Sequence, residues 1–412
     1  MKNSKKTANE KRTRKKNGEK LKLGIILSIF LLMSGSLFSV KGEELVIGVL
    51  GVMSGPAAQW GRINRNCAEV TAALYNEEGG VEIEKQRYFI RLLIRDTEMN
   101  PEKAEQGARE LIDAGVRYII GPNRDDTSRA IVPDLELKGA INIFYTSSIY
   151  LLQPPRSNSI MGMRPSSQSA PVMFRYLRDY QNVRSVGLVP FMDQDSMQQR
   201  NINERAALDL GLEVRHVDSF DFKNTYFGNN LSNAREVMKN MINEQPDLIT
   251  FPGALPDDLP RLVGLARAEG FSGVLGATAA HEPARLIAIG EAANGLYFLG
   301  GNPPEDSWSP YKREFVRRYR ALAGEWHDEA GTKAYAMEIL LRTLQKAGKR
   351  AIEDVEVFKK TMEGFSTQDP FLRKSRPLTY LDSGNFGQRR QINVPLLINS
   401  IQDNKVKTMH IN

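Results

Sequence analysis

The residue types that most often carry out catalysis occur in this sequence, but they are not spaced as a catalytic or metal site requires. The motifs G-x-x-x-x-G-K-[ST], H-E-x-x-H and G-x-S-x-G, which build phosphate, zinc and serine-nucleophile sites, are absent. Gly48, Gly51 and Gly55 follow an apolar run without the dinucleotide-binding spacing. The histidines are far apart and pair with nothing at metal-ligand spacing: His216, His281, His327 and His410. The sequence therefore predicts a protein without catalytic residues, metal or cofactor.

The positive charge of the chain is concentrated at its beginning. The formal net charge is +7, but residues 1–42 hold eleven Lys and Arg against two Glu, so the remainder carries −2. A body with no cationic surplus cannot neutralise a series of phosphates. We expect no nucleic-acid partner.

The first 42 residues have the parts of a secretory signal peptide. The Lys/Arg-rich stretch Met1–Lys22 precedes the apolar run Leu23–Val40, and small residues lead to a cleavage site after Gly42. The apolar run is about 18 residues long, at the lower limit for crossing a bilayer, so an uncleaved anchor is the alternative. We expect a soluble periplasmic or extracellular protein.

Cys67 is the only cysteine, which excludes an intramolecular disulfide. It lies in a segment with the apolar spacing of a helix, which predicts a buried thiol that acts as a small apolar side chain. The folded core of an exported chain of this length must then be stable without disulfide bonds.

Short apolar runs alternate with amphipathic segments along almost the whole chain. This alternation predicts parallel sheets with helices on both faces, and hence an α/β fold with two Rossmann-like lobes. A Pro/Ser-rich stretch, Gln153–Ser169, separates the halves as a crossing or linker. The expected strands are Leu45–Leu50, Tyr88–Ile94, Val116–Ile120, Ala140–Phe144, Ser185–Val189, Leu212–Val217, Asp247–Phe251 and Gly273–Leu275.

Several segments, in order along the chain, resemble the periplasmic leucine/isoleucine/valine-binding protein family of ABC transporters. The first is Val46–Gly61, in which a strand leads through Ser54-Gly55-Pro56 to a helix that contains Trp60. The others are Asn76–Gly80, Asn100–Ala104, Ile119–Pro122, Gln245–Ile249, Ala266–Phe271, Ala334–Ala336 and Leu378–Asn385.

The resemblance implies the type I periplasmic-binding fold, in which three chain crossings form a hinge between two lobes. Lobe 1 would comprise residues 44–166 and 299–380, and lobe 2 residues 167–298 and 381–412. It also implies a monomer that captures an amino acid or a related small polar solute in the cleft and delivers it to an ABC transporter permease. The alternative is a ligand sensor with the same fold and no role in transport.

The same resemblance implies which residues hold the ligand. Trp60 would offer an apolar face, and hydroxyl and backbone N–H groups at strand ends suit a small polar solute. N-capping of helices is the alternative role for the hydroxyl groups. The predicted ligand-binding residues are Trp60, Asp126, Thr127, Tyr145, Thr146, Ser147, Ser148, Asp195, Gly253 and Thr278.

Two departures from the family pattern bear on specificity. Asp125 and Asp126 stand in a loop that is serine-rich in the family, and Thr278 stands near the family's acidic residue. If either aspartate faces the cleft, a ligand carboxylate meets a like charge. The sequence then predicts weak binding of leucine, isoleucine and valine and a preference for a cationic or neutral ligand. The alternative is that both aspartates point to solvent and Thr127 takes the role of the family's serine.

The signal-peptide interpretation is tested by N-terminal sequencing of the protein secreted by its own cells. We expect the mature chain to begin near Glu43, because a signal peptidase cleaves after small residues. Recovery of Met1 or of the early lysines would contradict cleavage and favour a retained anchor.

Overall fold

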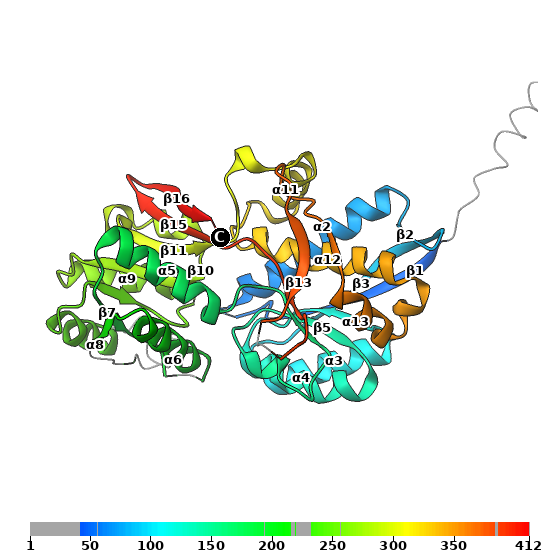
Figure 1. Ribbon diagram of the computed structural model, residues 1–412, viewed down its shortest axis with the longest axis horizontal. Helices are drawn as coiled ribbons and strands as arrows, with labels where there is room; N and C mark the ends of the chain where they lie inside the picture. The colour runs from blue at the N-terminus through cyan, green and yellow to red at the C-terminus, as the bar shows by residue number, and fades with distance from the viewer. Residues whose placement is uncertain are drawn as a thin grey trace, which may run out of the picture. The chain divides into compact units, whose positions relative to one another are not determined.

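The computed structural model describes residues 42–55, 57–192, 194–215, 219, 232–255, 257–383 and 386–411, so the predicted leader lies outside the described residues up to Lys41. Two sheets with helices on both faces form the two lobes (Figure 1). The predicted α/β class is confirmed. The first sheet has the order β12-β13-β14-β6-β5-β4-β1-β3-β2. These strands are β1 Glu43–Gly51, β2 Val81–Ile83, β3 Gln86–Asp96, β4 Tyr118–Ile120, β5 Ile141–Phe144, β6 Ser159–Met161, β12 Ser366–Gln368, β13 Pro377–Leu381 and β14 Gln391–Ile392.

The second sheet has the order β16-β15-β11-β10-β9-β7-β8. Its strands from β8 to β11 pair in parallel, and β15 and β16 add antiparallel strands at one edge. The first sheet likewise has a parallel centre, β1-β4-β5-β6. The strands of the second sheet are β7 Ser185–Leu188, β8 Glu213–Val214, β9 Leu248–Thr250, β10 Val274–Ala280, β11 Leu296–Gly300, β15 Leu397–Gln402 and β16 Lys405–Ile411.

The chain passes between the sheets three times, as the resemblance implies. It leaves the first sheet after β6, returns after β11, and leaves again after β14. Two expected boundaries need correction. β11 extends to Gly300 and pairs there with β15, so the second crossing follows residue 300 and not residue 298. Because β14 at 391–392 pairs with β6, the last crossing follows residue 392 and not residue 380. The stretch 153–169, expected to be a crossing or linker, contains the first crossing together with β6 and the first turn of α5.

Helices cover both faces of each sheet. On the first sheet, α2, α11, α12 and α13 contribute to one apolar cluster, and α3 and α4 to another. On the second, α8 and α9 contribute to one cluster, and α5 and α6 to another. The helices are α2 Ala58–Glu77, α3 Pro101–Asp113, α4 Asp125–Lys138, α5 Ser166–Gln181, α6 Gln194–Asp209, α8 Ser232–Asn243, α9 Asp258–Ala268, α10 Pro283–Ile287, α11 Pro310–Ala323, α12 Ala330–Ala347 and α13 Val355–Glu363.

Helix α3 shows how local sequence sets these elements. The Asn100 side chain accepts a hydrogen bond from the Lys103 N–H at 2.8 Å, and Pro101 occupies the first helical position. Both features satisfy or remove N–H groups that an N-terminal turn leaves unpaired. Ala104 and Leu111 are fully buried on the face that packs on the sheet, which explains why the pattern predicted this helix.

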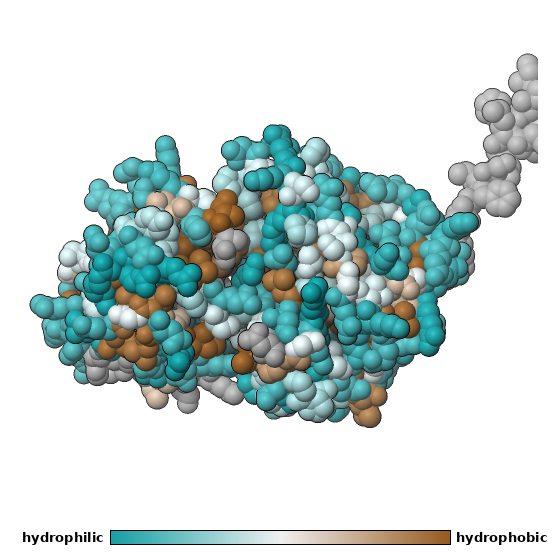
Figure 2. Space-filling model, viewed as in Figure 1, coloured by the Kyte–Doolittle hydropathy of each residue, from teal (hydrophilic) through white to brown (hydrophobic). Residues whose placement is uncertain are grey.

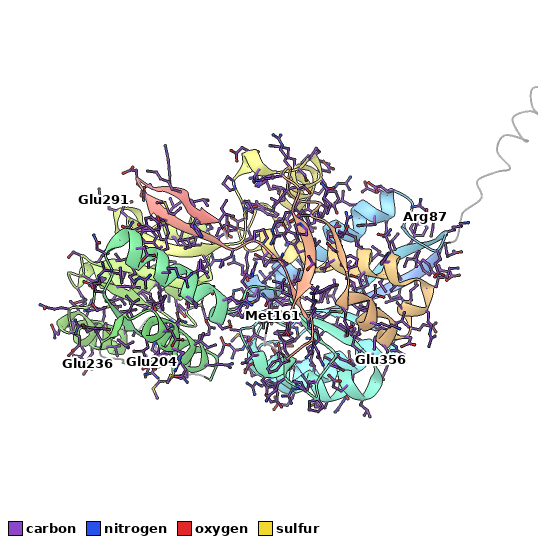
Figure 3. All side chains as sticks on the ribbon, in the orientation of Figure 1. Arg87, Met161, Glu204, Glu236, Glu291 and Glu356 are labelled. Carbon is purple, nitrogen blue, oxygen red and sulfur yellow. The ribbon has the colours of Figure 1, made fainter. Side chains whose placement is uncertain are left out.

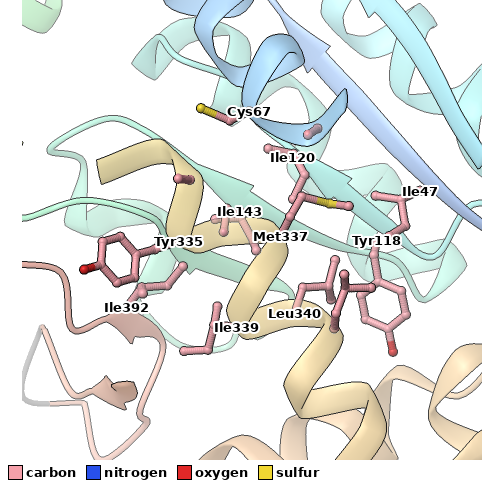
Figure 4. Packing of buried hydrophobic residues seen from close by; sticks show 14 of the residues in the cluster. Ile47, Cys67, Tyr118, Ile120, Ile143, Tyr335, Met337, Ile339, Leu340 and Ile392 are labelled. Carbon is pink, nitrogen blue, oxygen red and sulfur yellow. The ribbon is translucent and has the colours of Figure 1, made fainter. Parts of the chain in front are cut away.

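Helix α12 forms the centre of the largest apolar cluster. Figure 4 shows Met337 and Leu340 of this helix beside Ile47, Ile120 and Tyr118 of the first sheet. All five are almost completely buried. Since α12 also contributes to the site described below, the packing of this core determines where that site's side chains lie.

Charged residues lie over both lobes, and exposed apolar residues are scattered. Figure 3 labels Glu204 and Glu236 over the second sheet and Arg87 and Glu356 over the first. Hydrophilic residues cover most of the face drawn in Figure 2. Isolated exposed apolar residues such as Leu137 are normal for a protein surface. Among the described residues, no helix is long and apolar enough to cross a membrane.

The close approach of α2 to the end of β1 generates a stability prediction. The Gly61 N–H donates to the Val52 carbonyl at 3.0 Å, and a Cβ on Gly61 would lie 2.2 Å from that oxygen. We expect Gly61→Ala to lower the free energy of unfolding by about 1–3 kcal/mol, because the helix must shift. In denaturant titrations, Gly264→Ala is the control.

The Gly264 position lies inside α9 and has open space around its Cβ site. Alanine there should stabilise the protein by about 0.5–1 kcal/mol. Equal effects of the two substitutions would contradict the predicted close contact.

Candidate functional site

A cavity of about 120 Å³ lies between the carboxyl ends of the two sheets. Its wall combines residues in or just after strands of both sheets, residues of the helices α2, α6 and α12, and residues of the first and third crossings. The lining residues are Trp60, Asn123, Tyr145, Thr146, Ser147, Met163, Arg164, Ser166, Asp195, Gln199, Ala254, Thr278, Ala279, Leu299, Gly300, Glu329, Thr332, Lys333, Val394, Pro395 and Leu396. Parallel α/β sheets bind ligands at this edge, beyond the last ladder hydrogen bonds.

The first lobe supplies aromatic and hydroxyl side chains to the cavity wall. Tyr145, Thr146 and Ser147 directly follow β5 and are buried. Ser147 Oγ lies 2.9 Å from Ser166 Oγ and accepts from the Ser166 N–H at 3.0 Å. This pair connects the end of β5 to the start of α5, so the hydroxyl groups are positioned by a crossing as well as by a strand.

The second lobe presents a wall with little charge. Thr278 and Ala279 belong to β10, and Leu299 belongs to β11. The Ser169 hydroxyl donates to the Thr278 carbonyl at 3.3 Å, which ties α5 to β10. Asp195 contributes a carboxylate at the start of α6. The lining thus contains predicted residues from both lobes.

Six of the ten predicted ligand-binding residues line this cavity, and four do not. Those in the wall are Trp60, Tyr145, Thr146, Ser147, Asp195 and Thr278. Those outside it are Asp126, Thr127, Ser148 and Gly253. The Thr127 hydroxyl donates to the Arg124 carbonyl at 3.2 Å. Gly253 has φ of +77°, and a Cβ there would meet Ser196.

The premise that Asp125 or Asp126 faces the cleft is wrong. Asp125 is buried and pairs with Arg129 at 2.6 Å, one helical turn away. Asp126 pairs with Arg124 at 2.9 Å. Each carboxylate therefore has a guanidinium of its own, and neither lines the cavity. The alternative, in which both point to solvent, is equally wrong for Asp125.

Sequence reasoning missed a buried ion pair in the cavity wall. Lys333 Nζ lies 2.9 Å from Glu329 Oε1 and donates to the Trp60 carbonyl at 3.0 Å. Burial lowers the pKa of the Lys333 ammonium. The two residues are four apart, which is the signal that predicts a pair on one face of a helix. The sequence does not show that this face meets a cavity.

Two further residues of the wall were missed. Asn123 is buried, and neither its Oδ1 nor its Nδ2 has a hydrogen-bond partner among the described residues. Arg164 donates to the Val394 carbonyl, to Asn393 Oδ1 and to Gln168 Oε1 at 2.9–3.2 Å. Buried polar groups are normally paired, so the Asn123 side chain is an exception in this wall.

A second polar cluster lies at the crossing that follows β11. The Glu282 carboxylate, just beyond β10, accepts from the Asp328 N–H at 2.9 Å. Asp328 precedes α12 and accepts from the Gly301 N–H at 2.8 Å. These bonds join the two lobes beside the hinge. Burial, reinforced by the nearby carboxylates, raises the pKa of Glu282 to about 8. Among the described residues, no three His, Cys, Asp or Glu side chains are grouped as a metal site requires.

Sequence comparison finds relatives of one kind. Residues 44–385 match the family described as periplasmic binding protein. A Leu/Ile/Val-binding protein of Citrobacter freundii is 22% identical over 319 residues, which cover 77% of this chain and 82% of that protein. The Leu/Ile/Val-binding protein of Escherichia coli (strain K12) is 32% identical over 79 residues, 19% of this chain and only 20% of the relative's length.

Solved structures with the same fold include three with TM-scores of 0.71. Leucine binding protein LivK of Thermotoga maritima MSB8 is 19% identical and aligns over 89% of this chain and 98% of its own. LivJ of Streptococcus pneumoniae, in complex with isoleucine, is 16% identical over 90% and 99%. A solute binding protein of an ABC transporter from R. palustris, in complex with 4-hydroxybenzoate, is 17% identical over 90% and 97%.

The Glu282 carboxyl generates a pH prediction. Its pKa rises from 4.5 to about 8 on folding, so the folded state binds more protons than the unfolded chain between these values. Its contribution to stability therefore falls as pH rises across that window. Glu282→Gln keeps an oxygen for the Asp328 N–H and removes the titration. We expect the variant to gain stability relative to the wild type as pH increases from about 5 to 8.

Urea titrations at several pH values measure this difference, with the exposed Glu291→Gln as control. A wild-type-to-variant difference that stays constant over the window would contradict the predicted role of Glu282.

Proposed function

Because the chain belongs to the periplasmic binding protein family, which includes the leucine/isoleucine/valine-binding proteins, we propose that it is an exported receptor for a small organic solute. The resemblance predicted from the sequence is confirmed. The members with which this chain compares are binding proteins and not enzymes by name. The receptor captures its ligand in the cavity between the two sheets and delivers it to the permease of an ABC transporter.

The cavity between the lobes is the observation that carries this proposal. About 120 Å³ is close to the size of cavities that hold one benzene-sized molecule, which favours a compact ligand. Trp60 and Tyr145 offer aromatic faces, and hydroxyl groups stand beside them. Similar proteins hold isoleucine or 4-hydroxybenzoate. We therefore propose an amino acid or an aromatic acid as the broad ligand class.

Delivery requires that the ligand changes what the permease contacts. A cavity lined from both lobes achieves this, because bound ligand favours the closed arrangement of the three crossings. The proposed site of action is the periplasm or the extracellular space, with the protein acting as a monomer.

Release and rebinding of the ligand test the receptor proposal. Mass spectrometry of the denatured purified protein should detect a small organic molecule, which is then titrated back by calorimetry. We expect Trp60→Ala to weaken its binding at least about tenfold, since an aromatic side chain contributes much of the contact area in such a site. Leu137→Ala, at a position 82% exposed in α4, should leave binding unchanged. Equal affinities of the wild type and Trp60→Ala would contradict the assignment of this cavity.

A further inference from the structure

We propose that Lys333 determines the specificity of the cavity, which selects a small carboxylate that carries no ammonium group. This inference rests on the proposed receptor function and narrows its ligand class. The cavity would then prefer aromatic or branched aliphatic acids to amino acids of the same shape.

The position of the Lys333 ammonium is the first observation. The side chain is 1% exposed, and it reaches the cavity wall from the first turn of α12. Two of its three N–H groups are used by Glu329 and by the Trp60 carbonyl. Nζ also lies 5.4 Å from the centre of the Tyr145 ring. One N–H therefore remains for an acceptor on the ligand, next to two aromatic residues.

The second observation is the distribution of the other charges in the wall. Arg164 makes its hydrogen bonds to neutral oxygens, and no carboxylate of the described residues forms an ion pair with it. It lines the same cavity as Lys333. Burial, and then the charge of Arg376, lowers the pKa of Arg164. The wall therefore holds two cations, Lys333 and Arg164, and two carboxylates, Glu329 and Asp195, of which Glu329 is already paired with Lys333.

The remaining carboxylate, Asp195, is compensated by its own helix. It lies in the first turn of α6, where the helix dipole favours negative charge, and it accepts from Gln199 Nε2 at 2.8 Å. The facing wall from the second lobe is formed by Thr278, Ala279 and Leu299. A ligand ammonium would therefore lose water without gaining an uncommitted carboxylate, whereas a ligand carboxylate meets buried donors.

A matched pair of ligands tests this without any substitution. Leucine and 4-methylpentanoate have the same carbon skeleton and differ by the ammonium group. In calorimetric titrations of the wild type, we expect 4-methylpentanoate to bind about 100-fold more tightly than leucine, because the ammonium would be buried without a partner. Tighter binding of leucine would overturn the inference and leave the receptor function standing.

A second pair tests the residue itself. 4-Hydroxybenzoate and 4-hydroxybenzyl alcohol differ by the carboxylate. Lys333→Met should weaken 4-hydroxybenzoate about 10- to 150-fold, the range for a lost hydrogen bond to a charged group, and change the alcohol much less. Lys333→Arg, which keeps the charge, should retain most of the preference for the acid. A purely structural role of Lys333 would weaken both compounds equally and would overturn the inference.

Circular dichroism and thermal melting establish that each variant is folded before titration. If none of the four compounds binds and the purified protein releases no small molecule, the receptor proposal itself is contradicted along with this inference.

Discussion

Parallel strands end together, and the backbone groups beyond their last hydrogen bonds have no neighbouring strand to pair with. Both sheets of this chain have parallel centres, and their carboxyl ends meet at one cavity. The groups there are satisfied in different ways. The Ser166 N–H donates to Ser147 Oγ, and the Thr278 carbonyl accepts from Ser169. The side-chain amide of Asn123, just beyond β4, has no partner among the described residues. The polar lining of the site follows from this constraint, and so does its position at the hinge.

The hinge is built from side chains as well as from backbone. Arg164 of the first crossing donates to the Val394 carbonyl of the third, and Asp328 holds the Gly301 N–H of the second. Both contacts are short, and the one between Asp328 and Gly301 is buried, so side chains of the hinge region tie its connections together. Lys333, another residue of the cavity wall, joins two helices of the first lobe, because its ammonium donates to the Trp60 carbonyl on α2.

The sequence predicted the elements well where local patterns dominate. Asn100 and Pro101 mark the start of α3, and apolar runs mark β1, β5 and β9, because capping and burial depend on neighbouring residues. The sequence did not predict the elements and contacts that depend on residues far apart in the chain. The two-residue strand at 391–392 is defined only by its pairing with the distant strands β6 and β13. Asp125 and Asp126 suggested a negatively charged cleft, but each pairs with an arginine and neither lines the cavity.

The charged residues of the site could not be predicted from the sequence for the same reason. Lys333 looks like an ordinary surface lysine paired at i and i+4 until α12 is placed against the first sheet. Arg164 lies in a Pro/Ser-rich stretch that predicted a crossing or linker but no site residue. Burial of a charge depends on tertiary packing, so no periodicity in the chain identifies it.

The burial of Cys67 determines how the chain behaves in the oxidising environment outside the cytoplasm, where we propose that it acts. Its thiol is buried against α12, 3.8 Å from the Ala330 carbonyl, and burial raises its pKa well above the ordinary value. A thiol in this state supplies almost no thiolate, which is the form that attacks disulfides and oxidants. A folded molecule therefore resists mixed disulfides with glutathione and cross-links with its copies. When the first lobe unfolds, the same sulfur becomes exposed and reactive. Labelling of Cys67 by a thiol-specific reagent therefore identifies molecules that have lost their fold.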